Sequence, residues 1–347
     1  RLRHCDQALP ARSSRSSRKR EGGNRQHAGF TLPARSSRPS RKREGGSRQH
    51  AGFTLLEMLI VIAIILIVAS SAMFAMYGAS QKAAETRTRS QIAKLNELLM
   101  RRWQTYQTRS VPIRVPAGTD PKAAAQRRLD AIRELLRMEL PERKSDVDDA
   151  PVTAGMPQTT LWLAYRAMAT ASWTTEFQDA ECLYMIVSNM NDGIGNSSAS
   201  DFFAESEITD LDGDGMPELV DGWGNPFGFL RWAPGFVSDS SGTVYSDLQD
   251  GDPVNSHDPF DPLRLDDDAF ALYPLVFSAG RDEAYDILRI DHDNASPPNN
   301  IPVQYSVAPM SNNPYATLPS SGKLLGSPFV NSTGYKDNIT NHLLESN

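Results

Sequence analysis

An apolar stretch from Leu55 to Tyr77 constrains this chain more than any other feature. Glu57 is the only charged residue within it. A helix rises about 1.5 Å per residue, so a helix of this length crosses the hydrocarbon core of a bilayer, which is about 30 Å thick. The stretch therefore predicts a single membrane-spanning helix over 53–77.

Glu57 is an unexpected residue for such a helix. A charged side chain at bilayer depth costs at least about 2.5 kcal/mol, so a functional role is the first interpretation. The alternative is that Glu57 lies near the headgroups and stays hydrated.

The residues around Glu57 favour the functional interpretation. A basic segment ends at Gly52, Glu57 is the fifth residue counted from Phe53, and an unbroken apolar run follows. The sequence G-F-T-L-L-E-M-L-I-V-I-A-I-I resembles the processing site of the type IV pilin and type II secretion pseudopilin superfamily.

This resemblance implies roles for three residues. A membrane-embedded prepilin peptidase would cut between Gly52 and Phe53 and methylate the new amino terminus of Phe53. Glu57 would meet the amino-terminal charge of a neighbouring subunit during assembly. Opposite charges in a medium of low dielectric attract strongly, and each is costly when unpaired.

The charge distribution predicts the orientation in the membrane. Residues 1–52 carry fourteen Lys and Arg against three Asp and Glu, whereas the remainder carries 22 basic and 39 acidic residues. Basic residues before an apolar helix hold that flank in the cytoplasm, so the carboxyl-terminal head is expected outside the cytoplasmic (inner) membrane. No nucleic-acid binding is expected, because no aromatic residues interleave with the basic clusters.

The basic segment is a tandem duplication, since residues 9–31 recur at 32–54 with two substitutions. Only the second copy runs into Glu57 and the apolar helix. We expect 1–52 to be a prepilin leader that is removed, and to be disordered where it is present.

A secretory signal peptide is the alternative interpretation of the amino-terminal region. Small residues at the far end of the apolar run, Ala69 to Ala72, would suit its cleavage. The length of the run and the presence of Glu57 argue against it.

The helix is predicted to continue over 78–108, because Ser80 to Gln107 lacks Pro and Gly. Its apolar residues recur at helical spacing and predict one face packed on a globular head: Ile92, Leu95, Leu98, Leu99, Trp103 and Tyr106. A long amino-terminal helix, half of it in the membrane, is what the pilin fold requires.

Residues 109–190 predict a helical insertion that the resemblance does not cover. Asp120 and Pro121 open an amphipathic helix that runs to Leu140, with Leu129, Ile132, Leu135, Leu136 and Leu140 on its core side. Pro141 ends it, and a charged link from Glu142 to Pro157 follows. Further helices are expected over 159–170 and 175–190, with Trp162, Tyr165, Trp173 and Cys182 in the core.

Residues 191–293 predict a small antiparallel sheet packed on the long helix, with β-like runs at 227–232, 272–278 and 285–290. The tail, 294–347, is expected to be irregular and partly ordered on the head. The predicted fold class is therefore α+β: a pilin-like fold with an additional helical insertion.

The segment D-L-D-G-D-G-M-P-E-L-V-D, at 210–221, has the spacing of a calcium-binding loop. Carboxylates or a carbonyl fall at the expected ligand positions: Asp210, Asp212, Asp214, Met216, Glu218 and Asp221. Gly215 permits the sharp turn. Calcium is the predicted cofactor, although Asp stands at the twelfth position, where Glu is usual, and aspartates also favour plain turns.

Two further segments resemble those of major pseudopilins. D-G-W-G-N-P-F at 221–227 is similar to their D-x-W-G-N-P stretch, and F-S-A-G-R-D at 277–282 to an S-x-G-x-D segment in their last strand and calcium loop. Asp282 is thus a secondary calcium candidate. For the first segment a structural turn with a packed indole is expected.

Cysteine usage also favours the pseudopilin branch. Cys5 lies in the leader and Cys182 is alone beyond it, so no intrachain disulfide survives removal of the leader. Many type IV pilins close with a disulfide, whereas major pseudopilins often bind calcium.

No catalytic pattern emerges, since His257, His292 and His342 lack metal-ligand spacing or a nucleophile motif. The favoured hypothesis is a pseudopilin of a type II secretion system. Its partners would be further pseudopilin subunits in a homo- or heteropolymer, prepilin peptidase, the inner-membrane secretion platform and lipid. The alternatives are a type IV pilus subunit for adhesion or DNA uptake, and a membrane-tethered extracytoplasmic enzyme or binding module.

Overall fold

The computed structural model describes residues 52–151, 153, 155–190, 198–237, 245–289, 313–315, 323–328 and 336–344. The leader before Gly52 and most of the tail lie outside these ranges, so the expectations of disorder for them stay predictions. The chain divides into two compact units, Arg1–Ile60 and Val61–Asn347.

The longest element is helix α1, Leu55–Thr108, with 54 residues. Its apolar part contains an 18-residue window of mean hydropathy 2.8, of which none is buried. Large apolar side chains there are exposed, for example Leu55 at 84% and Phe74 at 79%. A helix so apolar and so uncovered is one that lipid or other subunits must cover, and this anchors the chain in a membrane by a single span.

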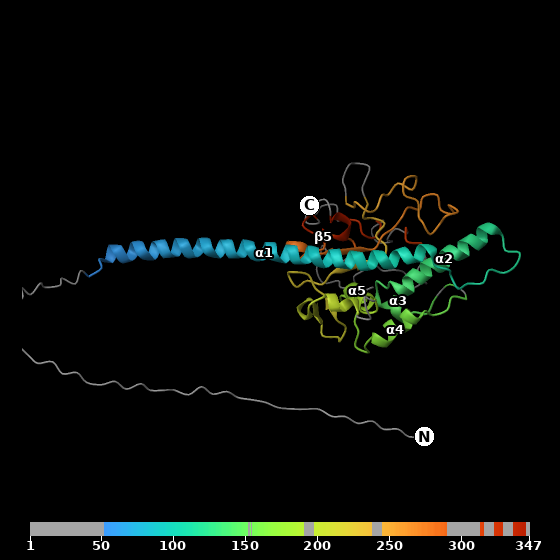
Figure 1. Cartoon of the computed structure of the whole chain (residues 1–347), viewed down its shortest axis with the longest axis horizontal. Coiled ribbons are helices and arrows are strands. Elements are labelled where there is room, and N and C mark those ends of the chain that lie inside the picture. The colour runs from blue at the N-terminus through green and yellow to red at the C-terminus, as the bar shows by residue number, and fades with distance from the viewer. Residues whose placement is uncertain are drawn as a thin grey trace, which may run out of the picture. The chain divides into compact units, whose positions relative to one another are not determined.

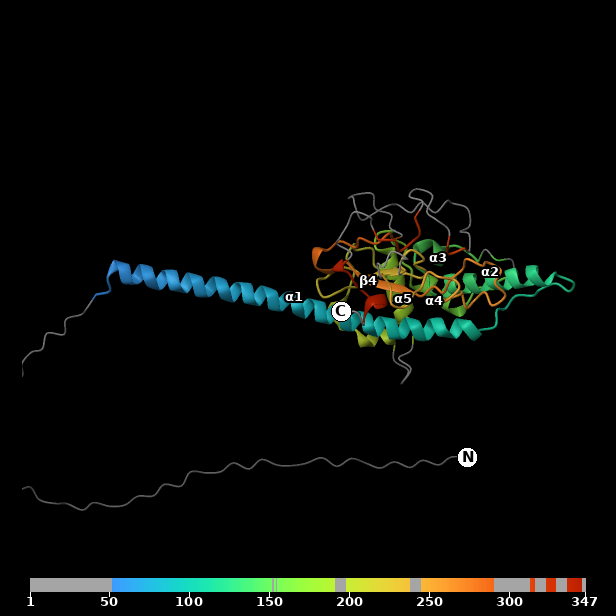
Figure 2. The same cartoon turned by 90° about the horizontal axis from the view of Figure 1, so that it is seen from above.

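The second part of α1 carries the predicted stripe. All six residues expected on it are buried, together with Thr88 and Gln91. Figures 1 and 2 show helices α2 to α5 and the strands gathered along this part of the helix. The spacing of three and four residues places these side chains on one face, so this face becomes one wall of the core.

The helical region folds much as its sequence predicts. Helix α2 is Pro121–Glu139, and the Asp120 carboxylate caps it by accepting from the N–H groups of Lys122 and Ala123. Helices α4, Thr160–Met168, and α5, Gln178–Ser188, fall within the predicted ranges. The charged link contains one element that was not predicted, the short helix α3, Lys144–Asp148. The expected core residues Trp162, Tyr165, Trp173 and Cys182 are all buried.

Two small antiparallel sheets lie within the described residues. Strands β1, Ile208–Thr209, and β2, Glu218–Leu219, form a hairpin. A three-stranded sheet has the order β3, Gly228–Leu230; β4, Leu275–Ser278; β5, Ile339–Thr340. Short 3₁₀ turns lie at Ala199–Phe202, Glu205–Glu207, Gly280–Asp282 and Asn341–Leu343.

The third strand is not the predicted one. The run 285–290 was expected to join the sheet, but its described part makes only an isolated bridge, Ile287 with Pro328. The tail supplies β5 instead, through Thr340 paired with Phe277. The described end of the tail is thus ordered on the head.

Side chains from helices and strands pack in one core. The domain boundary predicted between 109–190 and 191–293 stays a prediction. Leu136 of α2, Ile186 of α5 and Phe229 of β3 belong to the same cluster of buried side chains. A second, smaller cluster surrounds Leu275 of β4 and Ile287.

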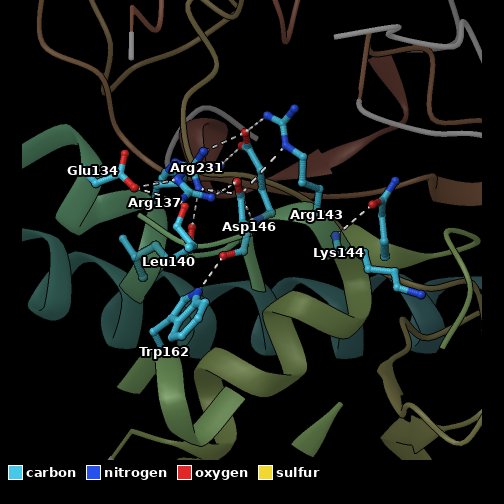
Figure 3. A network of polar contacts seen from close by, with 11 residues as sticks. Glu134, Arg137, Leu140, Arg143, Lys144, Asp146, Trp162 and Arg231 are labelled. Carbon is cyan, nitrogen blue, oxygen red and sulfur yellow. Dashed lines mark hydrogen bonds and ion pairs between the residues drawn. The ribbon is translucent and has the colours of Figure 1, made fainter. Parts of the chain in front are cut away.

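A buried ionic network joins the end of β3 to the α2–α3 region (Figure 3). The Arg231 guanidinium, fully buried, donates to Asp146 at 2.9 Å and to Glu142 at 3.1 Å. Arg137 approaches the same Asp146 at 3.5 Å and Glu134 at 2.7 Å. Burial opposes ionisation of Asp146, yet the surrounding guanidinium groups lower its pKa. Each charged group named here has an ion-pair partner within the network.

Candidate functional site

The predicted processing site lies just before α1. Gly52 and Phe53 precede the first helical turn, and Phe53 is 81% exposed. The peptide bond between them is therefore accessible in a segment without regular structure.

Glu57 closes a reciprocal cap with Thr54. The Thr54 N–H donates to Glu57 Oε2 at 2.7 Å, and the Glu57 N–H donates to Thr54 Oγ1 at 3.1 Å. This T-x-x-E arrangement is a capping box, which satisfies two of the free N–H groups at a helix start. The sequence analysis did not identify this local role, although the spacing carries its signal.

The predicted calcium loop connects β1 to β2. Its first three acids come together, because one carboxylate oxygen from each of Asp210, Asp212 and Asp214 lies within 4.8 Å of the others. Backbone N–H groups of the loop orient them: Gly213 donates to Asp210 at 2.8 Å and Met216 to Asp214 at 2.8 Å. Strands rather than helices flank the loop, which distinguishes it from an EF-hand.

A second acidic group includes a residue that sequence reasoning missed. Glu181, on α5, lies with Asp212 and Glu218 so that one oxygen of each is within 4.8 Å of the others. Glu181 and Glu218 are fully buried, and Oε1 of each lacks a hydrogen-bond partner. Their second oxygens are bonded: Glu181 accepts from the Trp173 indole N–H, and Glu218 accepts from the Leu211 N–H at 3.0 Å.

Burial changes the acidity of both glutamates. It raises the pKa of Glu181 to about 9, and the negative charges of Asp214 and Glu218 act in the same direction. Burial also raises the pKa of Glu218 to about 7, whereas the hydrogen bond from the Leu211 N–H acts to lower it. Two carboxyl groups are thus held where ionisation is costly unless a cation is close.

Asp221 does not join either group of converging carboxylates. The ligand predicted from Met216 is its backbone carbonyl, which stays a prediction; the side chain is 1% exposed and packs in the core. Asp221 is engaged elsewhere, because its Oδ1 accepts from the N–H groups of Trp223 and Asn225 and its Oδ2 accepts from the Ser278 hydroxyl. Asp282, the secondary candidate, accepts from the Ala284 N–H.

The turn after Asp221 docks the head on α1. The Gly222 N–H donates to Thr88 Oγ1 at 2.9 Å, and the Trp223 indole donates to Gln81 at 2.7 Å. A Cβ on Gly222 would lie 2.3 Å from the carbonyl oxygen of Ala84, so only glycine fits. The expected structural turn with a packed indole is what the structure contains.

His342 lies beside a serine in a way that superficially suggests a nucleophile pair. Ser246 Oγ is 2.9 Å from His342 Nδ1, and both residues are buried. However, His342 Nε2 faces the carbonyl of Pro274, and Ser246 Oγ already accepts from the Gln249 N–H at 2.8 Å. Both ring nitrogens of His342 are thus engaged, by the Ser246 hydroxyl and the Pro274 carbonyl, whereas a catalytic triad would place a carboxylate at the second nitrogen.

Comparison with known proteins agrees with the geometry of the amino-terminal region. The exposed apolar part of α1 begins at a capping box that contains Glu57. The family model described as the prokaryotic N-terminal methylation motif matches residues 47–73, so the chain carries the signature of type IV pilins and pseudopilins. No curated protein and no solved structure matches it. The signature points to a structural subunit rather than an enzyme.

Proposed function

We propose that this chain is a pseudopilin: a structural subunit that polymerises through α1 into the short periplasmic fibre of a type II secretion system. The observation that carries this proposal is the uncovered apolar part of α1, which begins with the methylation motif and contains a single acid. Apolar helices of many copies would bury one another in the fibre and leave the heads outside.

Glu57 is proposed as the assembly charge. In a growing fibre its carboxylate would pair with the methylated amino terminus of Phe53 on a neighbouring subunit. Two opposite charges in low dielectric attract strongly, so a correctly placed neighbour is favoured over a misplaced one. Prepilin peptidase would release this amino terminus by cutting after Gly52, and the inner-membrane platform would feed subunits into the fibre.

The head supports the pseudopilin branch. The two segments that resemble major pseudopilins are far apart in the sequence, yet the Ser278 hydroxyl of one donates to the Asp221 carboxylate of the other at 2.5 Å. Cys182 is a buried free thiol rather than half of a disulfide.

Mass spectrometry of the mature amino terminus tests the processing step. The expected species begins with N-methylated Phe53. A chain that keeps its arginine-rich leader in its native cell, or is cut after Ala72, contradicts the proposal.

The assembly role needs a variant that separates charge from capping. Glu57→Gln removes the charge but keeps a side chain that can cap Thr54. We expect it to insert in the membrane and to be absent from fibres. Glu97→Gln is the matched control, because Glu97 is on the same helix with its side chain 72% exposed. Normal fibre incorporation of Glu57→Gln would remove the proposed role.

Deletion of the gene distinguishes the two kinds of fibre. A pseudopilin deletion should stop export of secreted proteins and leave surface filaments intact. Loss of surface filaments with normal secretion would identify a type IV pilus subunit instead.

A further inference from the structure

Five carboxylates from three segments form two overlapping groups in the head. Glu181 comes from α5, Asp210, Asp212 and Asp214 come from the loop, and Glu218 comes from β2. Asp212 belongs to both groups of converging oxygens, and it is the point at which the loop meets the two buried glutamates.

No cation of the described residues pairs with any of these five acids. The ion pairs found in the described part of the chain involve other carboxylates. The hydrogen-bond partners of Glu181, Asp212 and Glu218 are neutral N–H and O–H groups. The acids therefore concentrate negative charge without an internal counterion.

The unpartnered oxygens distinguish this cluster from a plain acidic turn. Oε1 of Glu181 and Oε1 of Glu218 are buried without a partner. A buried acceptor left without a partner is destabilising, and more so when it is charged. Two such oxygens among converging carboxylates are the arrangement that a bound cation would satisfy.

We infer that Glu181, Asp212 and Glu218 bind one divalent cation, with calcium as the preferred ion, and thereby fasten the β1–β2 hairpin to α5. The donors are all hard carboxylate oxygens, which suit calcium and magnesium rather than softer metals. Calcium takes six to eight oxygens in a flexible arrangement, and Asp210 and Asp214 lie close enough to add to the negative field. The inference does not depend on fibre assembly.

This site differs from the loop that the sequence predicted. In a 12-residue calcium loop the last position closes the coordination. Here that position, Asp221, serves the turn that docks on α1. Glu181, 29 positions before Asp210 in the printed sequence, approaches from a neighbouring helix and takes the closing place.

The hydrogen bonds around the site extend it to the 170–174 segment. The Asp214 carbonyl accepts from the hydroxyls of Thr170 and Ser172, at 2.9 and 2.6 Å. The Thr174 hydroxyl donates to Asp212 at 2.9 Å. Cation binding should therefore order the 170–174 segment together with the loop.

Cation binding is measured on the full chain in detergent micelles, stripped of metal with a chelator. Calcium is titrated calorimetrically, and terbium is followed by its luminescence, since the Trp173 indole contacts Glu181 and can sensitise it. We expect one calcium per chain and a terbium signal that calcium displaces. Absence of both overturns the inference.

Two carboxylate variants decide which ligand set is correct. Glu181→Gln should weaken calcium binding at least about tenfold, because it removes one charged ligand. Asp221→Asn is the matched control and should leave the affinity within about threefold, since Asp221 lies outside the cluster. The reverse result, a loss with Asp221→Asn only, overturns the inference in favour of the loop.

Thermal unfolding gives a second readout, because the effect of Glu181→Gln on the melting temperature should differ between calcium and chelator. In calcium, Glu181→Gln should melt below the unmodified chain; in chelator it should melt at or above it, since a buried acid has been replaced by a neutral amide. Equal loss in both conditions overturns the inference. If Glu181→Gln fails to fold, Glu218→Gln, in strand β2, allows the same comparison of melting temperatures in calcium and in chelator.

Discussion

The Ser278 hydroxyl donates to the Asp221 carboxylate at 2.5 Å, and both residues are buried. This hydrogen bond connects β4 to the turn that docks on α1. Burial raises the pKa of Asp221, and the hydrogen bond from Ser278 acts in the opposite direction. Ser278 therefore helps to keep a carboxylate charged at the junction between sheet and long helix.

Replacing Ser278 by Ala should destabilise the head. Asp221 Oδ2 would lose its donor in a buried place, which costs about 1–3 kcal/mol. Urea unfolding followed by tryptophan fluorescence measures this loss. Ser80→Ala, at an exposed position of α1, is the control and should change stability by less than about 0.5 kcal/mol. A loss no larger than the control's would show that Asp221 finds another donor.

Gly222→Ala tests the close approach of the turn to α1. The added Cβ would lie 2.3 Å from the Ala84 carbonyl oxygen, so the turn must move away from the helix. We expect a loss of about 1–3 kcal/mol, as for overpacking of a core. Gly78→Ala is the contrast, because no atom lies within 4 Å of its Cβ position. On a helix this change should be neutral or stabilising by up to about 1 kcal/mol. Equal effects of the two substitutions would contradict the docking contact.

Arg231→Met tests the buried ionic network. Removal of the guanidinium leaves Glu142 and Asp146 short of a partner in a buried place, and breaking such a pair costs about 3–5 kcal/mol. Arg101→Met removes an exposed pair with Glu97 and should cost less than about 1 kcal/mol. Chemical denaturation compares the two variants, and similar midpoints would mean that the network does not contribute to stability.

His342 predicts a pH dependence of folding. Burial is the main cause that lowers its pKa from 6.5 to about 4, so the folded chain holds the neutral ring. Between these two values the unfolded chain binds more protons, and stability falls as the pH decreases from 6.5 to 4. The full effect is on the order of 3 kcal/mol, and below pH 4 this residue adds no further loss.

The measurement compares unfolding free energies of the unmodified chain and His342→Gln at several pH values in chelator, so that metal binding does not contribute. The variant should show a flatter dependence between pH 6.5 and 4. Parallel curves would mean that His342 is protonated without penalty in the folded chain.

Much of the helical architecture could be predicted, because periodic apolar residues and caps are local signals. The buried stripe on α1 and the Asp120 cap follow from spacing alone. The convergence of Asp210, Asp212 and Asp214 likewise follows from alternate residues on a short curled loop.

The parts that could not be predicted depend on contacts between distant segments. Strand β5 has two residues, which is too short to show any period, and its place is set by pairing with β4. The run 285–290 is apolar because Ile287 and Leu288 pack in the smaller core cluster, not because it is a strand. Glu181 gave no signal of its own, since an acid on a helix is ordinarily solvated, and only the fold places it beside Glu218.

The cap between Glu57 and Thr54 has a consequence for how a subunit would enter and leave a polymer. Before incorporation the Glu57 carboxylate already accepts a hydrogen bond from the Thr54 N–H, so it would not be without a partner in the lipid. The amino terminus of Phe53 on an arriving subunit would compete with the Thr54 N–H for the Glu57 carboxylate. When that subunit leaves, the Thr54 N–H would bond to Glu57 again. The hydrogen bond from the Thr54 amide would thus reduce the cost of holding the Glu57 carboxylate in the apolar layer until a charged partner arrives.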